Sequence, residues 1–219
     1  MARSLRLQFP GAYYHVFSRG NEKREIVREE YDYRMFLSIL VECAEKDEVV
    51  IYAYCIMPNH FHLLIQTKQA NLAVFMKRLI GTYTMRFNYR HERVGHLFQG
   101  RYKSIVIDKD TYLLELSRYI HLNPCKAKLV DNPVDYVWSS MRYFVRDEPP
   151  SFLGSLEIMN QFQSPVDYQT FVHKGLITNI NPLQNAVGNG ILGSQEFVQR
   201  LGVRSGTWPQ VRKVASQPK

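Results

Sequence analysis

The sequence predicts an α+β fold in which helices cover an antiparallel sheet. Three observations lead to this prediction. Four segments have strand-like patterns, and a segment with helical apolar spacing lies between the first and second of them and another between the third and fourth. A turn signal joins the second segment to the third. The resulting order, β-α-β-β-α-β, is that of the ferredoxin-like split βαβ sandwich. A third helix follows the fourth strand. It is expected on the face of the sheet that the first two helices leave open.

The four predicted strands are residues 12–19, 49–57, 60–66 and 101–107. The first alternates and is rich in β-forming residues, whereas the second is a near-continuous apolar run typical of a central strand. Pro58-Asn59 is a turn signal, so the second and third strands are expected to form a hairpin. The fourth alternates again and places Arg101 and Lys103 on one face with Ile105 and Ile107.

The three predicted helices are residues 31–46, a segment that begins after a cap at Asn71, and a segment from Asp108 towards Asn123. The second helix has a basic face formed by Lys77, Arg78, Arg86 and Arg90. Such a face is usually solvated, and a role in contacting phosphate groups is the alternative. The pattern alone leaves both open.

Length and composition suit one domain of ordinary size with an appendage. The chain has 219 residues, of which 45% are hydrophobic, enough for a buried core. Pro149-Pro150 marks a boundary, so we predict a domain over residues 1–148 and a C-terminal extension over residues 149–219. The last residues, 204–219, contain basic side chains and no acid. We expect this end to be flexible.

The charge balance points to a polyanionic partner, because the net charge is +8 and the pI is about 9.4. The three cysteines are far apart and form neither a disulfide framework nor a CxxC zinc motif, which suits a reducing compartment. No apolar run approaches the roughly 20 residues that span a bilayer, and the basic N-terminus lacks an apolar signal region. We therefore expect a cytoplasmic protein.

The most distinctive chemistry lies in His60-Phe61-His62. Residues two apart in a strand point to the same face, so the imidazoles of His60 and His62 should lie side by side while Phe61 faces the core. Two imidazoles at this spacing can hold one divalent cation, because histidine is the commonest metal ligand. The alternative is a pair of half-buried histidines that hydrogen-bond to their neighbours.

A second candidate group lies near the end of the third helix. Tyr119 and Asn123 are four residues apart and share one helix face. An amide oxygen one turn from a tyrosine hydroxyl could complete a metal site while the phenol reaches a bound substrate. The alternative is structural, because tyrosine is common on helices and Asn before Pro124 is a usual helix end. Of the rival tyrosines, Tyr112 shares the helix face and Tyr102 is predicted to lie in the core.

Four motifs in order resemble a known family: Pro10-Gly11-Ala12-Tyr13-Tyr14-His15-Val16, Met57-Pro58-Asn59-His60-Phe61-His62-Leu63-Leu64, Leu97-Phe98-Gln99-Gly100-Arg101-Tyr102 and Tyr119-Ile120-His121-Leu122-Asn123-Pro124. Together they resemble the HUH single-tyrosine transposases, most closely the REP-associated tyrosine transposases. The resemblance covers about residues 8–145. Longer relatives have a further DNA-binding region where this chain has its extension, which does not clearly match.

The resemblance implies a metal-dependent transposase and endonuclease that acts on single-stranded DNA. It makes His60, His62 and Asn123 ligands of Mg²⁺ or Mn²⁺, and Tyr119 the nucleophile. Two imidazoles favour Mn²⁺ or a similar ion, because Mg²⁺ prefers oxygen ligands. Attack by the Tyr119 oxygen would leave a 5′-phosphotyrosine and a free 3′-OH, and a second 3′-OH could then rejoin the strand.

The resemblance also implies a DNA partner in the bacterial cytoplasm, at the nucleoid. Relatives recognise a short hairpin beside the cleavage site, and a site on an open sheet face requires a single strand. The candidates for phosphate contacts are Arg101, Lys103, Lys77 and Arg78. Relatives include monomers as well as dimers that swap the tyrosine helix, so the oligomeric state stays open.

Two other functions compete with this one. A non-catalytic ferredoxin-like module that binds RNA or DNA would use the histidines only for packing, and it predicts binding that EDTA does not change. A His-ligated metallohydrolase would need a carboxylate ligand and a general base near the histidines. No Asp or Glu accompanies them on their own strand.

Overall fold

One five-stranded sheet organises the protein in the computed structural model, which describes residues 6–146, 149–178, 181–186 and 190–202. The strands are β1 (Tyr13–Arg19), β2 (Val49–Met57), β3 (His60–Thr67), β4 (Lys103–Ile107) and β5 (Ile191–Leu192). Their order is β2-β3-β1-β4-β5. The pairs β2–β3, β3–β1 and β1–β4 are antiparallel, whereas β5 runs parallel to β4. The predicted ferredoxin-like α+β fold is therefore confirmed.

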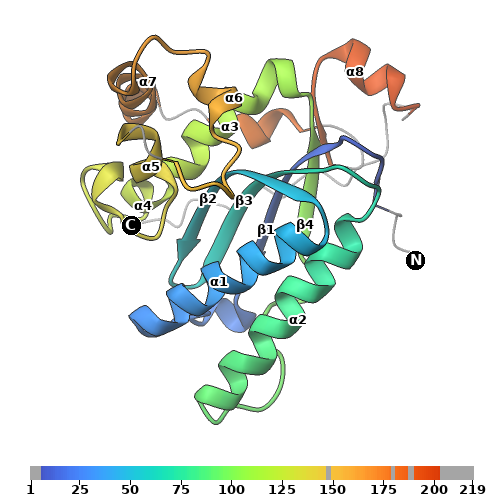
Figure 1. The fold of residues 1–219 in the computed structure, drawn as a ribbon, viewed down its shortest axis with the longest axis vertical. Coiled ribbons are helices and arrows are strands. Elements are labelled where there is room, and N and C mark those ends of the chain that lie inside the picture. The colour runs from blue at the N-terminus through green and yellow to red at the C-terminus, as the bar shows by residue number, and fades with distance from the viewer. Residues whose placement is uncertain (1–5, 147–148, 179–180, 187–189, 203–219) are drawn as a thin grey trace, which may run out of the picture.

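The three long helices of this unit lie on opposite faces of the sheet. Helices α1 (Glu30–Lys46) and α2 (Leu72–Arg90) pack together on one face, and α3 (Lys109–His121) packs on the other, against β2 and β3 (Figure 1). The alternation of β3 explains this division. Phe61 faces α1, where its ring lies 5.0 Å from that of Phe36, and His62 faces α3.

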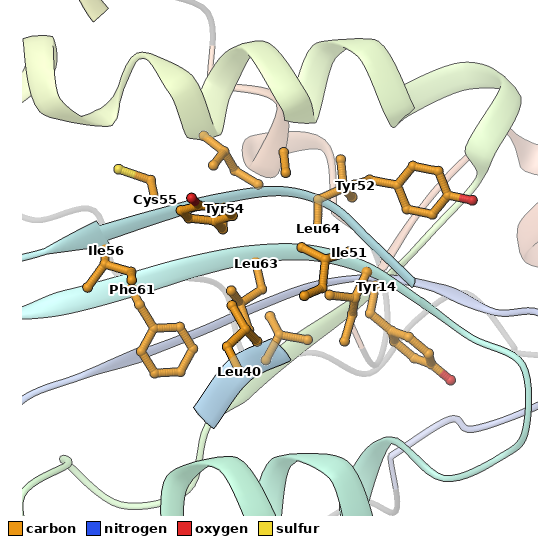
Figure 2. Packing of buried hydrophobic residues seen from close by; sticks show 14 of the residues in the cluster. Tyr14, Leu40, Ile51, Tyr52, Tyr54, Cys55, Ile56, Phe61, Leu63 and Leu64 are labelled. Atoms are coloured by element: carbon orange, nitrogen blue, oxygen red, sulfur yellow. The ribbon is translucent and has the colours of Figure 1, made fainter. Parts of the chain in front are cut away.

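Both faces of the central strands are buried, as expected for strands covered on each side. In Figure 2, Phe61 and Leu63 point towards Leu40 of α1, whereas Cys55 and Tyr52 lie on the side of α3. Every residue from Ile51 to Met57 is buried. The near-continuous apolar run of β2 is thus accounted for by packing on both sides.

The remaining helices are short, apart from α7. They are the 3₁₀ helices η1 (Asn21–Lys23), η2 (Pro133–Asp135) and η3 (Pro182–Asn185), and the α-helices α4 (Asn123–Lys126), α5 (Met141–Val145), α6 (Leu156–Met159), α7 (Pro165–Thr178) and α8 (Gln195–Arg200). None of the helices within the described ranges has the length and apolar character needed to cross a bilayer.

Two details differ from the sequence prediction. Asn71 does not cap α2 with its side chain; its amide donates to the Asp47 carbonyl oxygen, while Gln8 Oε1 accepts from the backbone N–H of Ala73. The fourth strand begins at Lys103, so Arg101 precedes it in an exposed segment. The Gly100 backbone, with φ of 71°, interrupts the extended conformation just before Arg101.

The C-terminal extension packs against the preceding residues. The Gly154 N–H donates to the Ile51 carbonyl oxygen, β5 extends the sheet beside β4, and α7 contacts α3 (Figure 1). Sequence periodicity did not predict α7. The division into residues 1–148 and 149–219 stays a prediction, and the segment expected to be flexible, residues 204–219, lies outside the described ranges.

Candidate active site

The centre of the candidate site is the pair His60 and His62 on β3. Both side chains lie on the face covered by α3, as the strand alternation predicts, and their ring centroids are 5.1 Å apart. His62 is buried, whereas His60 is partly exposed at the start of the strand. The Nδ1 atom of His60 is 2.6 Å from Asn59 Oδ1, so the side chain of the hairpin turn orients this ring.

A third histidine, His15 on β1, joins this pair. Its Nε2 atom lies 2.9 Å from His62 Nδ1, and the two rings are stacked with centroids 5.1 Å apart and an interplanar angle of 9°. His15 is fully buried. The sequence alone does not predict a role for His15, because the residue of β1 that faces His62 is set by strand register, which one sequence does not reveal.

All three imidazoles are held in the neutral form. Burial lowers the pKa of His15 to about 3 and, together with the charge of Arg19, that of His60 to about 4. Burial and the neighbouring histidines lower the pKa of His62 well below its usual value. A neutral imidazole whose one nitrogen is hydrogen-bonded presents the other nitrogen as a lone-pair donor. This arrangement suits a metal ligand.

Helix α3 places Tyr119 against these histidines. The Tyr119 ring meets His62 and His15 edge to face, with centroids 5.8 Å and 6.0 Å apart. Burial raises the pKa of its phenol. The rival Tyr102 is buried, as predicted, with the guanidinium of Arg6 over its ring, and Tyr112 packs against the hydrophobic core.

Asn123 folds back onto the end of the tyrosine helix. Its Nδ2 atom donates to the carbonyl oxygen of Tyr119 at 2.8 Å and faces that of Ile120 at 3.5 Å. In the part of the chain that the structure describes, its Oδ1 atom accepts no hydrogen bond. The amide nitrogen is therefore used by the helix end, and the amide oxygen is available to a ligand.

Three cationic side chains surround the site. Arg19 is directly opposite His60 in the β1–β3 register, Lys103 Nζ lies 5.8 Å from the Phe17 ring centroid, and Lys126 Nζ lies 5.1 Å from that of Tyr119. Lys126 reaches Tyr119 because α4 continues α3 after one residue, with Pro124 in its first turn. Within the described ranges, none of the three makes an ion pair with a carboxylate.

The other predicted basic contacts are elsewhere. Lys77 and Arg78 belong to α2, which covers the face of the sheet opposite the histidines, and Arg78 pairs with Asp47 at 3.0 Å. Arg101 is exposed in the segment before β4. Of the four basic residues that the sequence suggested, Lys103 is the one brought next to the histidine face.

A different group of potential metal ligands lies at the start of α1. Ligand atoms of Glu29, Asp32 and His91 come within 4.8 Å of one another. The buried Asp32 carboxylate already accepts the backbone N–H groups of Arg28 and Glu29 and contacts His91 Nε2 at 2.9 Å. We assign this group to the capping of α1, where Glu29 and Asp32 form a capping box.

Comparison with known proteins identifies the family. The family described as IS200-like transposase matches residues 8–123, more than half of the chain. The chain belongs to this family. The predicted resemblance to HUH single-tyrosine transposases is confirmed, and the protein is a transposase. The match ends at Asn123, so it includes the histidine pair and Tyr119 and stops before the extension.

One solved structure shares the fold. A REP-associated tyrosine transposase bound to a REP hairpin superposes on this transposase with a TM-score of 0.58 and 15% identity, covering 69% of this chain and 90% of the other. A candidate transposase from Deinococcus radiodurans R1 gives a TM-score of 0.39 and 21% identity, covering 54% of this chain and 95% of the other. No curated protein sequence matches the chain.

Proposed function

We propose that this transposase cleaves and rejoins single-stranded DNA beside a hairpin, with Tyr119 as the nucleophile. The observation that carries the proposal is the contact of Tyr119 with the buried His15–His62 pair. A phenol at this position is within reach of a phosphate group bound at the histidines. A protein that only binds nucleic acid would not require a tyrosine ring against neutral imidazoles that are suited to bind a metal ion.

The donor set fits a divalent metal ion. His60 and His62 are neutral, each has one nitrogen hydrogen-bonded, and the Asn123 amide oxygen has no hydrogen-bond partner in the described ranges. These three side chains would hold the ion, and two imidazoles favour Mn²⁺ over Mg²⁺. When bound, a divalent ion supplies positive charge at the phosphoryl oxygens and lowers the cost of charge on the leaving oxygen.

The reaction exchanges one phosphorus–oxygen bond for another. The Tyr119 oxygen forms a bond to phosphorus, the bond from phosphorus to the 3′ oxygen breaks, and that oxygen leaves as a 3′-OH. The proton that the phenol loses goes to solvent, and the leaving oxygen takes one up. A later attack by a 3′-OH on the phosphotyrosine reverses these changes without an external energy source.

The substrate is proposed from the charge around the site and from a related structure. Arg19, Lys103 and Lys126 surround the histidines with positive charge that suits a phosphodiester backbone. A related protein of known structure was solved with a REP hairpin, which motivates a hairpin next to the single strand. A monomer or a dimer is compatible with this proposal.

Trapping the covalent intermediate tests the proposal. Hairpin oligonucleotides with randomised single-stranded flanks, labelled at either end, are incubated with the protein and Mn²⁺ and resolved under denaturing conditions. We expect an adduct that retains the 3′ label, because tyrosine is joined to the 5′-phosphate, and a released fragment that retains the 5′ label.

Substitutions provide the controls for this experiment. Tyr119→Phe keeps the ring and its packing but removes the nucleophilic oxygen, so it should form no adduct, whereas Tyr112→Phe should form one. His60→Ala should abolish cleavage and leave most of the DNA binding. An adduct in Tyr119→Phe, or none in the unsubstituted protein with DNA bound, would contradict the proposal.

A further inference from the structure

We propose that Phe17, with Lys103 and Arg19 beside it, forms a subsite in which an unpaired nucleobase stacks next to the candidate active site. This inference rests on the proposed function, since it concerns the DNA strand that lies across the histidine face. It assigns a binding role to an aromatic residue that neither the reaction nor the core requires.

The surroundings of Phe17 are unusual for an aromatic residue. The Phe17 side chain is partly buried, but it does not pack against the hydrophobic core. Every other partly buried Phe, Tyr or Trp in the described ranges does. Its neighbours are polar rings: His15 stacks on it at 5.1 Å and 22°, and His62 at 5.7 Å and 30°. The core therefore does not explain a phenylalanine here.

Positive charge lies on two sides of this ring. Lys103 is opposite Phe17 in the β1–β4 register and extends its ammonium group over the ring. Arg19 follows two residues after Phe17 on the same face of β1. Both side chains are exposed. A base on Phe17 would thus have a cation available for the phosphate on either side of it.

Phe17 lies beside the strands that α3 covers. Helix α3 packs against β2 and β3, and its Tyr119 ring reaches His15 and His62. Phe17 is on β1, between β3 and β4, on the side of His62 away from β2. A strand whose phosphate lies at His62 and Tyr119 therefore has its neighbouring base within reach of Phe17.

A flat apolar ring flanked by cations is suited to bind one class of ligand, single-stranded nucleic acid. Bases of single-stranded nucleic acid stack on aromatic rings with little sequence preference, because every base has a π-face, while cations follow the backbone. Paired bases in a duplex present no free face to such a ring. The subsite therefore selects unpaired nucleotides.

Oligonucleotides with and without bases separate stacking from charge. Binding is measured by fluorescence anisotropy in the Tyr119→Phe protein, so that no cleavage occurs. The probes are dT12 and a 12-unit deoxyribose-phosphate strand that has no bases. We expect the protein to prefer dT12, and Phe17→Leu to weaken dT12 binding about tenfold without changing abasic binding. Phe17→Trp should retain the preference.

Two further variants complete the design. Lys103→Ala should lower the affinity for both probes equally. It should also reduce the slope of log K against log salt by about 0.7, the value for one phosphate contact on a single strand. Phe171→Leu is the matched control, because that partly buried phenylalanine on α7 also has a cation over its ring, Arg118 at 4.5 Å, but packs against the core. It should leave both affinities unchanged.

The outcomes distinguish this inference from the proposed function. If Phe17→Leu lowers the affinity for both probes equally, or for neither, the proposed stacking subsite is refuted while the covalent mechanism stands. If the protein binds neither probe, the proposed action on single-stranded DNA fails together with the subsite. Loss of the base preference in Phe17→Leu alone establishes the subsite.

Discussion

At the residue scale, metal binding by each imidazole depends on the hydrogen bond that its other ring nitrogen makes. For His62 to offer Nε2 to a metal ion, its Nδ1 must carry the proton and donate to His15 Nε2, which lies 2.9 Å away. Outer hydrogen bonds of this kind fix the tautomer and orientation of a metal-binding histidine. His15 is therefore a positioning residue, and its buried Nδ1 atom has no protein partner in the described ranges.

Substitution of His15 tests this role. His15→Phe keeps an aromatic ring stacked on His62 but removes the nitrogen that accepts the hydrogen bond from His62 Nδ1. We expect Mn²⁺ affinity, measured by isothermal titration calorimetry on the protein without DNA, to fall about 10- to 100-fold. His15→Gln, which can still accept a hydrogen bond, should recover part of the loss. An unchanged affinity in His15→Phe would mean that His15 only fills space.

Asn123 makes a second prediction at this scale. A single amide oxygen is a weak ligand, so Asn123→Ala should raise the Mn²⁺ concentration needed for half-maximal cleavage and leave activity at saturating metal. Asn123→Asp replaces the oxygen with a charged one and should lower that concentration again. If Asn123→Ala titrates with metal like the parent, Asn123 serves only the helix end, where its Nδ2 atom already donates to Tyr119.

At the scale of elements, a buried hydrogen-bond network holds the tyrosine helix. His121 at the end of α3 contacts the Tyr168 hydroxyl of α7 and Ser140 Oγ, each at 2.7 Å, and Tyr168 donates to Ser117 Oγ. Ser140 Oγ in turn accepts the Tyr54 N–H of β2. Helix α3 is thereby fixed to the sheet and to the extension at once, which supports the position of Tyr119.

The network predicts a pH dependence of stability. Burial lowers the pKa of His121 to about 3, from the model-peptide value of about 6.5. Below pH 6.5 the unfolded chain binds a proton at this histidine that the folded protein does not. The contribution of neutral His121 to the free energy of unfolding is therefore complete above pH 6.5 and is lost as the pH falls towards 3. The loss is about 1.4 kcal/mol per pH unit.

Urea denaturation between pH 4.5 and 7.5 measures this contribution. His121→Gln can still hydrogen-bond to Tyr168 and Ser140 but does not titrate. The pH slope of its free energy of unfolding should therefore be smaller by about one proton than that of the parent. An identical slope in both proteins would show that His121 is not held neutral by the fold.

At the scale of the whole molecule, local patterns predicted the four-stranded unit and its three helices. Strand alternation also predicted that His60 and His62 share a face and that α3 would cover it, because side-chain direction follows directly from a period of two. Helix spacing placed Tyr119 and Asn123 on one face, and the resemblance added their roles as nucleophile and metal ligand. The strand and helix predictions depend on residues close together in the sequence.

What the sequence did not predict depends on contacts between distant segments. His15, Phe17 and Arg19 enter the site through the register of β1 with β3 and β4, and Lys126 enters through the continuation of α3 into α4. Helix α7 was missed because its few buried residues, Tyr168, Val172 and Gly175, form a narrow stripe. Such a stripe is too weak a periodic signal to predict a helix.

Identification of the modified residue tests the central claim most directly. The adduct formed with DNA and Mn²⁺ is isolated under denaturing conditions, digested with a nuclease and a protease, and analysed by mass spectrometry with fragmentation that localises the remaining nucleotide. We predict a 5′-linked nucleotide on Tyr119. A nucleotide on Tyr112, one heptad earlier on the same helix, or on any other residue would contradict the account.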